Sequence, residues 1–244
     1  MPLRILVNGA NGKMGQITVK TLSQQPNFTV VGATHRGDNL AEEIKKSNAQ
    51  IVVDLTNADA VLKNIQTIID AGVHPVIGTS GLVKEQIIKL QEQCAQLKLG
   101  GLIVPNFSLG AILMMKCAQE VAKYFPNAEI IEMHHDGKLD SPSGTAVRTA
   151  EMIAEARVQL PAVLANSRET IPGARGAHYQ QTFIHAVRLP GMVAHQQVIF
   201  GGLGETFTLR HDAIDRQCFM AGMILACSKV SELKTLVCGL EHVL

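Results

Sequence analysis

Short apolar runs alternate with longer amphipathic stretches from the start of the chain to about residue 107. Short runs bounded by turn residues are typical of strands, and apolar residues at helical spacing are typical of helices. The predicted strands are Arg4–Val7, Phe28–Ala33, Gln50–Asp54, Pro75–Gly78 and Gly101–Val104, and the predicted helices are Met14–Leu22, Ala58–Ala71 and Val83–Leu97. Strands that alternate with helices over short turns favour a parallel, doubly wound α/β sheet.

The pattern changes after residue 107, and we place a domain boundary there. Ser143 has the residue type and the position of a helix N-cap. The further predicted helices are Leu109–Tyr124, Gly144–Arg157 and Gln217–Val230, and the further predicted strands are Ala128–His134, Gln181–Leu189, Val193–Phe200 and Glu205–His211. The last three strands follow one another over Gly/Pro turns, which predicts an antiparallel meander. Gln159–His178, with its prolines and glycines, is predicted to be a long loop.

The composition excludes several classes of partner. Hydrophobic residues make up 46% of the chain and charged residues 18%, which is typical of a globular protein. The 22 Lys and Arg residues against 21 Asp and Glu residues leave a net charge of +1, so neither nucleic acid nor an anionic membrane is expected as a partner. No apolar run is long enough to span a membrane. Met1–Gly9 leads directly into a strand without signal-peptide features, so we expect a cytoplasmic protein.

Cysteine spacing gives no sign of a metal site. The five cysteines are Cys94, Cys117, Cys218, Cys227 and Cys238. They are odd in number and form no CxxC pair, so we predict neither a zinc site nor a disulfide framework. Most of them lie in apolar helical patterns, which predicts buried and unreactive thiols.

A glycine-rich turn follows the first predicted strand and begins the first helix. It reads Gly9-Ala-Asn-Gly12-Lys-Met-Gly15. Glycines let the backbone approach a pyrophosphate, and the helix start offers free N–H groups and the positive end of its dipole. The spacing is GxxGxxG rather than GxGxxG, so the strand–turn–helix context supports a dinucleotide site more than the glycines do. A tight turn without a ligand is the alternative.

The end of the second predicted strand lacks the carboxylate that usually binds the ribose hydroxyls of NADH. His35 and Arg36 stand there instead. Arg36, with Lys13 of the glycine turn, can pair with a 2′-phosphate, so we expect NADPH or NADH as cofactor with NADPH preferred. The alternative is that both are solvated surface cations.

Two further loops follow predicted parallel strands. They are Gly78-Thr-Ser-Gly81 and Pro105-Asn-Phe-Ser108. Loops at the carboxyl ends of such strands form the ligand crevice of a doubly wound sheet. Taken alone, each loop is more typical of an ordinary turn than of a ligand site.

The most specific segment runs from Glu132 to Ala146 and contains His134, His135 and Lys138 ahead of the Ser143-Gly144-Thr145 helix start. A lysine, a histidine that can donate and the N–H groups at the helix start suit an anionic substrate, and one histidine remains for proton transfer. A metal site is disfavoured because adjacent histidines point in different directions. The alternative is a polar connector before a capped helix.

Several motifs together resemble the dihydrodipicolinate reductase family. They are the glycine turn, Gly78-Thr-Ser-Gly81, Asn106-Phe-Ser108, the Glu132–Ala146 run, Ile184–Gly191, Val198–Gly201, Gly204-Glu205 and Arg210–Arg216. The resemblance extends from residue 4 to about residue 230. It implies a Rossmann-like dinucleotide-binding domain of residues 1–107 plus 215–244, with an inserted α+β domain of residues 108–214 that binds substrate and builds a homotetramer.

The resemblance also implies a role for individual residues. His134 resembles the proton donor and acceptor, and Lys138 the proton donor, while His135, Gly144 and Thr145 resemble the contacts to a substrate carboxylate. The residues that resemble the dinucleotide site are Gly9, Ala10, Asn11, Gly12, Lys13, Met14, Arg36, Gly78, Thr79, Ser80, Pro105, Asn106 and Phe107. Lys13, Ser80 and His35 depart from residues common in the family, and the chain is short between Arg36 and Ile51, so the contacts there transfer least safely.

The expected activity is reduction of a cyclic dicarboxylate, 4-hydroxy-tetrahydrodipicolinate, to tetrahydrodipicolinate in lysine and diaminopimelate synthesis. Two other functions stay open. A semialdehyde-type dehydrogenase needs an activated cysteine, and no cysteine here lies in a Gly/Asn-rich loop with a suitable histidine. A non-catalytic dinucleotide sensor would keep Gly9–Gly15 but would have no use for His134, His135 and Lys138 beside a helix start.

Overall fold

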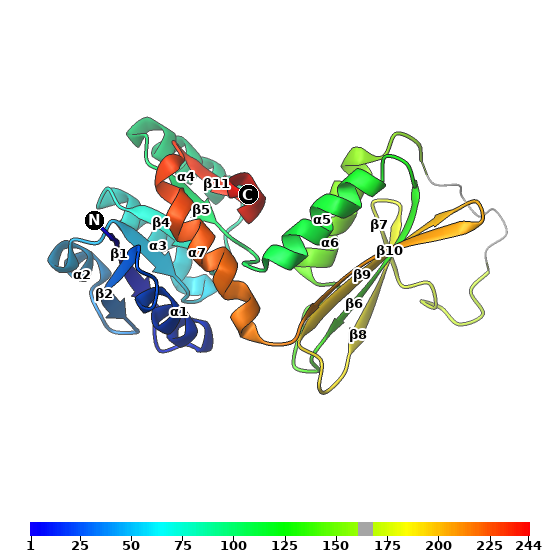
Figure 1. The fold of residues 1–244 in the computed structure, drawn as a ribbon, viewed down its shortest axis with the longest axis horizontal. Coiled ribbons are helices and arrows are strands. Elements are labelled where there is room, and N and C mark those ends of the chain that lie inside the picture. Colours follow the sequence, from blue (N-terminus) through cyan, green and yellow to red (C-terminus); the bar gives the residue numbers. More distant parts are fainter. Residues whose placement is uncertain (161–167) are drawn as a thin grey trace. The chain divides into compact units, whose positions relative to one another are not determined.

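The computed structural model describes residues 1–160 and 168–244. By their internal contacts these residues form two compact units (Figure 1). The first unit contains Met1–Ser108 and Arg216–Leu244, and the second contains Leu109–Asp215. Within the described residues, no helix has the length and apolar character needed to cross a membrane.

The first unit is built on a six-stranded parallel sheet. Its strands are β1 (Leu3–Asn8), β2 (Phe28–Thr34), β3 (Ile51–Asp54), β4 (His74–Ile77), β5 (Gly101–Ile103) and β11 (Leu236–Cys238). They lie in the order β11-β5-β4-β3-β1-β2, so the chain moves one way from β1 to β2 and the other way from β3 onward. This is a doubly wound sheet, as the alternation of strands and helices predicted.

Helices cover both faces of this sheet. They are α1 (Lys13–Ser23), α2 (Leu40–Ser47), α3 (Ala58–Asp70), α4 (Lys84–Leu97) and α7 (Met220–Lys229), with short 3-10 turns η1 (Arg216–Phe219), η2 (Val230–Glu232) and η3 (Leu240–Val243). α1 and α7 contact each other, while α2, α3 and α4 form a second contacting row. Fully buried side chains such as Leu6, Val52, Ile65 and Ile77 fill the core on the α3 side.

Two elements of this unit were not predicted. α2 is short and polar, and only Ile44 and Ser47 on it are buried, so its apolar period is weak. Its start is nevertheless encoded, because Asn39 accepts a hydrogen bond from the Glu42 N–H and donates one to the Glu42 carboxylate. β11 has three residues, too few for a period-2 pattern to show.

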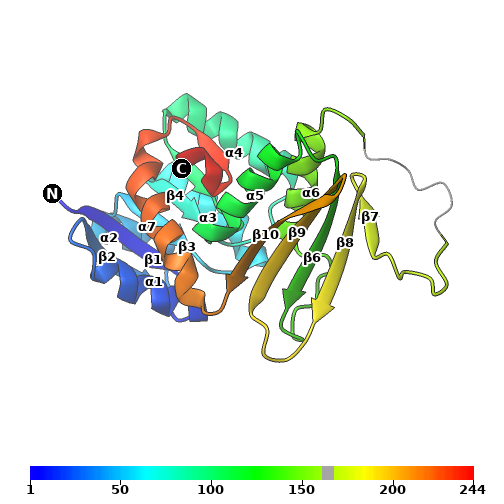
Figure 2. The same cartoon turned by 45° about the vertical axis from the view of Figure 1, so that its right-hand side comes forward.

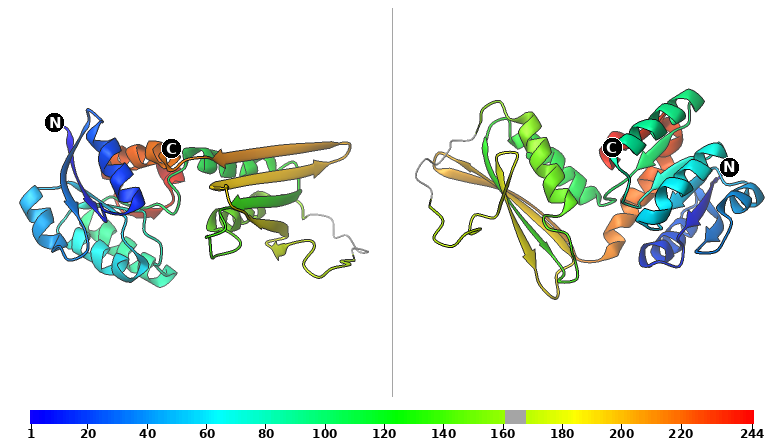
Figure 3. Two further views of the ribbon diagram at one scale, coloured as in Figure 1. Left: turned by 90° about the horizontal axis from the view of Figure 1, so that it is seen from below. Right: turned by 180° about the vertical axis from the view of Figure 1, so that it is seen from behind.

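The second unit is a five-stranded mixed sheet with two helices on one side (Figures 2 and 3). Its elements are α5 (Leu109–Val121), β6 (Asn127–His134), α6 (Gly144–Ala156), β7 (Ala177–Tyr179), β8 (Thr182–Arg188), β9 (Ala194–Gly202) and β10 (Glu205–Ala213). Ile130, Ile184, Val198 and Phe200 point to the helices and are buried with Ala146 and Ile153 of α6. β6 and the helix after it therefore share one core.

The predicted meander of three consecutive strands is wrong in one pairing. β9 and β10 form the expected antiparallel hairpin, but β6 lies between β8 and β9. β6 pairs parallel with β8 and antiparallel with β9. The physical reason is that β6 pairs with a strand that comes after α6 and β7 in the chain, and local turn residues do not report a pairing of such distant segments. Of the predicted loop at 159–178, residues 161–167 lie outside the described residues, and Ala177 and His178 belong to β7.

Candidate active site

Four segments that the sequence proposed for dinucleotide binding lie at one edge of the first unit's sheet. Gly9–Met14 follows β1, Arg36 lies beyond the end of β2, and Gly78–Ser80 and Pro105–Phe107 come after β4 and β5. All these strands are parallel, so their carboxyl ends meet at the same edge. The chain reverses its direction of winding between β1 and β3, and ligands of doubly wound sheets bind beside such a point.

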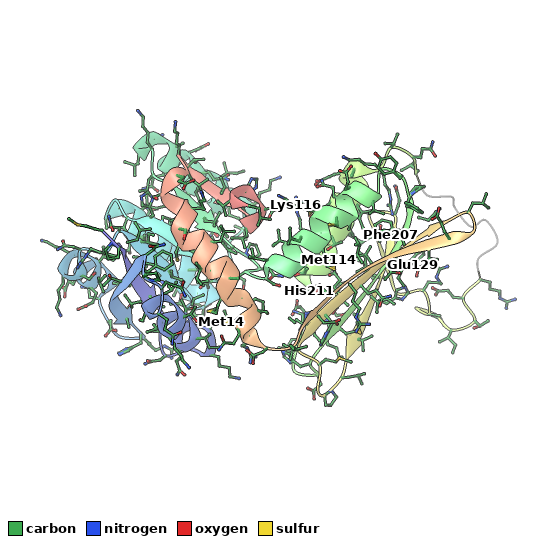
Figure 4. The ribbon with its side chains drawn as sticks, viewed as in Figure 1. Met14, Met114, Lys116, Glu129, Phe207 and His211 are labelled. Atoms are coloured by element: carbon green, nitrogen blue, oxygen red, sulfur yellow. The ribbon has the colours of Figure 1, made fainter. Side chains whose placement is uncertain are left out.

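The glycine turn is closely packed in a way that only glycine permits. Gly9 has a φ of +86°, and a Cβ there would lie 2.5 Å from the carbonyl oxygen of Leu55. A Cβ on Gly15 would overlap the carbonyl oxygen of Gly9. α1 then begins after Gly12 without a side-chain cap, with Met14 in its first turn (Figure 4). A backbone cradle that leads into an uncapped helix start fits a pyrophosphate group.

A buried carboxylate joins the loops around this edge. Asp54, the last residue of β3, is fully buried and accepts hydrogen bonds from Asn8 Nδ2 at 2.9 Å and Thr79 Oγ1 at 2.7 Å. Thr34 Oγ1, at the end of β2, donates to Asn8 Oδ1 at 2.9 Å. Thr79 is therefore held to β3 by its own side chain, and the ends of β1, β2 and β3 are locked together.

The turn after β2 presents cations to solvent. The Asp38 carboxylate accepts from the His35 backbone N–H at 2.8 Å, which fixes the turn. Arg36 is exposed, and no carboxylate among the described residues forms an ion pair with its guanidinium group. Lys13 is also exposed. The positions are compatible with a phosphate contact and equally with solvated side chains.

The two later loops pack against each other. A Cβ on Gly78 would lie 2.8 Å from Cε2 of Phe107, so the phenyl ring covers the backbone of Gly78. Phe107 and Thr79 are buried, whereas Ser80 and Pro105 are exposed. Asn106 Oδ1 accepts from the Ser108 N–H at 2.8 Å, so its amide shapes the loop. Ser80, Gly81 and Pro105 are the exposed members of these loops.

In the second unit, the predicted proton-transfer residue His134 is the last residue of β6. Its Nδ1 lies 2.5 Å from Oε2 of Glu132, which points to the same face of the strand two residues earlier. Arg188, the partner of His134 in β8, binds both oxygens of Glu132 at 2.8 Å. Burial alone raises the pKa of Glu132, but the hydrogen bonds from His134, Arg188 and the Ser143 N–H lower it to about 2.

Lys138 lies in the turn that follows β6. Its N–H donates to the His135 carbonyl at 3.1 Å, and its Nζ contacts both carboxylate oxygens of Asp140 at 2.7 Å. The hydrogen bond from Lys138 Nζ to the Asp140 carboxylate holds the pKa of Asp140 below its usual range. The Asp140 carbonyl accepts from Arg188 at 2.7 Å, so the Lys138 turn is tied to the same guanidinium as Glu132.

The start of α6 lies beside this cluster. Ser143 caps the helix as predicted, its hydroxyl accepting from the Ala146 N–H at 3.2 Å. The Ser143 N–H itself donates to Oε1 of Glu132 at 3.1 Å. Gly144 is exposed and Thr145 is half-buried. A helix start of this kind offers N–H groups and the positive end of the helix dipole to an anion.

Most of the predicted substrate and proton-transfer residues lie in one hydrogen-bonded cluster, but His135 lies outside it. His134, Lys138 and the Ser143–Thr145 turn are connected through Glu132 and Arg188. His135 is exposed, and in the described part of the chain no hydrogen bond links its ring to this cluster. Residue type and spacing assigned no role to Glu132 or to Arg188. The signal for Glu132 was its i,i+2 spacing to His134 in a strand, which puts both side chains on one face.

The cysteines are less uniformly buried than predicted. Cys94 and Cys227 are buried, and burial raises the pKa of their thiols to about 11 and about 12, which disfavours the thiolate that a nucleophile requires. Cys117 and Cys238, in contrast, are exposed, and Cys218 is half-buried. The helical periodicity that suggested burial is also compatible with the solvent side of a helix, where Cys117 lies.

Comparison with known proteins gives matches over both units. The family model described as dihydrodipicolinate reductase, N-terminus, matches residues 3–107, and the one described as dihydrodipicolinate reductase, C-terminus, matches residues 110–244. A 4-hydroxy-tetrahydrodipicolinate reductase of Legionella pneumophila (strain Paris) is 54% identical over 244 residues, with 100% of both chains covered. One of Coxiella burnetii (strain Dugway 5J108-111) is 48% identical over 247 residues, again with both chains covered completely.

Solved structures give a similar result. The dipicolinate-bound dihydrodipicolinate reductase from Paenisporosarcina sp. TG-14 superposes with a TM-score of 0.91 at 42% identity, with 100% of both chains covered. A probable dehydrogenase from Thermotoga maritima superposes with a TM-score of 0.63 at 12% identity, covering 98% of this chain and 92% of the other. The second likeness concerns the fold alone.

Proposed function

This chain belongs to the dihydrodipicolinate reductase family, and we propose that it reduces 4-hydroxy-tetrahydrodipicolinate to tetrahydrodipicolinate with a nicotinamide nucleotide. It is an oxidoreductase of lysine and diaminopimelate synthesis. The observation that carries the proposal is the cluster of His134, Lys138 and the α6 start around buried Glu132, in a chain that matches reductases of this name along its whole length.

The residues of the second unit would bind and protonate the substrate. The N–H groups of Gly144 and Thr145, together with Lys138 and His135, would bind the ring carboxylates, since each offers a donor to an anion. His134 and Lys138 would supply the proton, because both can carry one and both lie next to the helix start. Their contribution is orientation and charge stabilisation around the ring.

The residues of the first unit would hold the nucleotide. Gly9–Met14 would bind its pyrophosphate, and Gly78–Ser80 with Pro105–Phe107 would border its nicotinamide end. When bound, the nicotinamide supplies a hydride to the substrate ring. The closely packed Gly9 and Gly15 and the uncapped start of α1 support this assignment.

Binding measurements separate this proposal from its rivals. We would titrate the purified protein with NADPH, with and without pyridine-2,6-dicarboxylate. A reductase binds both compounds, whereas a dinucleotide sensor binds only the nucleotide. A semialdehyde-type dehydrogenase would lose activity when its cysteine is alkylated, and a reductase that uses His134 and Lys138 would not.

Thr145→Val is expected to weaken binding of the dicarboxylate and to leave the affinity for NADPH nearly unchanged. Thr145 lies in the first turn of α6, and a donor to a charged group is worth about 1.5–3 kcal/mol. Calorimetric titration with pyridine-2,6-dicarboxylate measures the loss, with Thr145→Ser as the control that keeps the hydroxyl. An unchanged KM and an unchanged dissociation constant in Thr145→Val would move the substrate away from this turn.

Arg36→Ala is expected to reduce the preference for NADPH over NADH. An exposed contact between Arg36 and a 2′-phosphate is worth about 1–2 kcal/mol after screening, which corresponds to a preference of roughly 5–30-fold in the unaltered protein. The kcat/KM values for both cofactors would be measured in low and high salt, with Lys20→Ala on α1 as a matched exposed cation.

The preference should approach parity in Arg36→Ala and should also shrink in high salt, while Lys20→Ala should resemble the unaltered protein. A protein that favours NADH, or an Arg36→Ala variant that keeps its preference, would place ribose recognition outside His35 and Arg36.

We further propose a cytoplasmic homotetramer that requires no nucleic acid and no membrane, in line with the balanced charge of the chain.

A further inference from the structure

The carboxylate of Glu132 is fully buried and yet remains charged. Burying a charge costs several kcal/mol unless its lone pairs are satisfied. Here each oxygen has two donors. Oε1 accepts from Arg188 at 2.8 Å and from the Ser143 N–H at 3.1 Å, and Oε2 accepts from Arg188 at 2.8 Å and faces His134 Nδ1 at 2.5 Å. Four donors around one carboxylate fix its position and the positions of the groups that donate to it.

The charge state of Glu132 determines the tautomer of His134. An ionised carboxylate is only an acceptor, so the ring nitrogen that faces it must carry the proton. Nδ1 faces Glu132, and in the neutral ring Nε2 therefore has no proton. Nε2 is then the nitrogen that can accept a proton and return it to a substrate. The ring is held by this contact while 15% of the side chain stays exposed.

We propose that Glu132, held by Arg188, is a positioning residue that keeps His134 in the Nδ1–H tautomer with Nε2 as its proton-exchanging atom. The proposal rests on the proposed function, because it assigns an atom to the proton transfer ascribed to His134. It also connects two parts of the site, since the same carboxylate fixes the Ser143 N–H at the start of α6.

Glu132→Gln tests the tautomer because of where the new amide must point. At the Oε1 position both neighbours, Arg188 Nη2 and the Ser143 N–H, can only donate, so the amide oxygen belongs there. The amide nitrogen then faces His134 Nδ1, to which it donates, while Arg188 Nη1 loses the acceptor it had at Oε2. The proton of the neutral ring is thereby moved from Nδ1 to Nε2, which is the wrong tautomer for accepting a proton at Nε2.

A matched control lies on the same strand. Glu129 of β6 (Figure 4) pairs with Arg175 and with Nε2 of His185 at 2.8 Å, so it too belongs to a Glu–His–Arg cluster. Glu129→Gln makes the same chemical change away from Glu132, and 39% of the Glu129 side chain is exposed. It is expected to leave kcat within about twofold, since a partly exposed pair contributes little.

The experiment combines nitrogen NMR of the histidine rings with a double-mutant cycle. At a pH where the His134 ring is neutral, we expect the proton on Nδ1 in the unaltered protein and on Nε2 in Glu132→Gln, with His134→Ala identifying the signal. Glu132→Gln should lower kcat by about 10²-fold or more in the unaltered background, the usual scale for disabling a general acid or base. In the His134→Ala background it should lower kcat by less than about threefold, because positioning acts only through the ring.

Equal losses in both backgrounds would show that Glu132 only stabilises the fold and would overturn the proposal. A proton on Nε2 in the unaltered protein would overturn it as well, and this measurement holds even if Glu132→Gln fails to fold. The ring signals need neither substrate nor turnover. Absence of reductase activity in the unaltered protein would therefore contradict the proposed function, and an incorrect tautomer would contradict this inference separately.

Discussion

His134→Ala is expected to lower kcat by roughly 10²-fold or more, the usual contribution of a general acid. The ring is anchored to Glu132 at Nδ1, and alanine removes the group that exchanges the proton while the backbone at the end of β6 keeps its pairing with β8. Affinity for NADPH should change little, because the predicted nucleotide residues lie in the other unit. Initial rates at saturating NADPH measure the effect. Unchanged binding of NADPH confirms that the first unit is intact, and an unchanged Tm confirms that the second unit is folded.

Lys138→Ala, the companion variant, is expected to impair both kcat and KM, because Lys138 would bind a substrate carboxylate as well as donate a proton. Lys123→Ala is the matched control, since Lys123 is also paired with a carboxylate, that of Glu120, in the second unit. Its kinetic constants should resemble those of the unaltered protein. If His134→Ala and Lys138→Ala both kept full turnover, the catalytic assignment would have to be abandoned.

Gly15→Ala is expected to weaken NADPH binding at least tenfold, which corresponds to about 1.4 kcal/mol, and to lower Tm. The added Cβ would overlap the carbonyl oxygen of Gly9 and crowd Ala10 Cα, and backbone atoms cannot move aside as a flexible side chain can. α1 must then shift away from the turn, and its first N–H groups shift with it. Overpacking of this kind costs about 1–3 kcal/mol. Fluorescence titration with NADPH and thermal unfolding measure both effects.

Gly201→Ala in β9 is the control for this substitution, because a Cβ there has no heavy atom within 4 Å. Its NADPH affinity should stay within about twofold of the unaltered value. If Gly15→Ala bound NADPH as tightly as Gly201→Ala does, the glycine turn would not form the pyrophosphate site, and its close packing would serve the fold alone.

Hydrophobic periodicity along the chain predicted most strands and helices of the first unit. It did not predict elements that lack such periodicity or the order of strands in a sheet. Strands such as β1 and β3 are buried along most of their length and read as continuous apolar runs. α2 was not predicted because it is mostly polar, and β11 was not predicted because it has only three residues. The strand order of the second sheet was not predicted, because the pairing of β6 with β8 and β9 joins distant segments. The alternation of apolar and polar residues in a strand shows which side chains are buried but not which strands pair with it.

In the candidate site too, residues within one short segment could be predicted, and residues brought together by strand pairing could not. His134, Lys138 and the Ser143 cap could be found from residue type and spacing, since they lie in one short segment. The partner that completes the cluster could not be found in this way. Arg188 is 56 positions from Glu132 along the chain, and only the parallel pairing of β6 with β8 brings its guanidinium to the carboxylate. The hydrogen bond of Thr79 to Asp54 likewise depends on the order of β3 and β4.

The most direct test is an assay in which the purified protein is mixed with NADPH and 4-hydroxy-tetrahydrodipicolinate. Oxidation of NADPH and formation of tetrahydrodipicolinate are measured in the same reaction. We expect one NADPH to be oxidised for each tetrahydrodipicolinate formed, with no oxidation when the ring substrate is left out and a greatly reduced rate in His134→Ala. Tight binding of NADPH without any oxidation, or oxidation that yields no tetrahydrodipicolinate, would contradict the assignment of this chain as a reductase of the cyclic dicarboxylate.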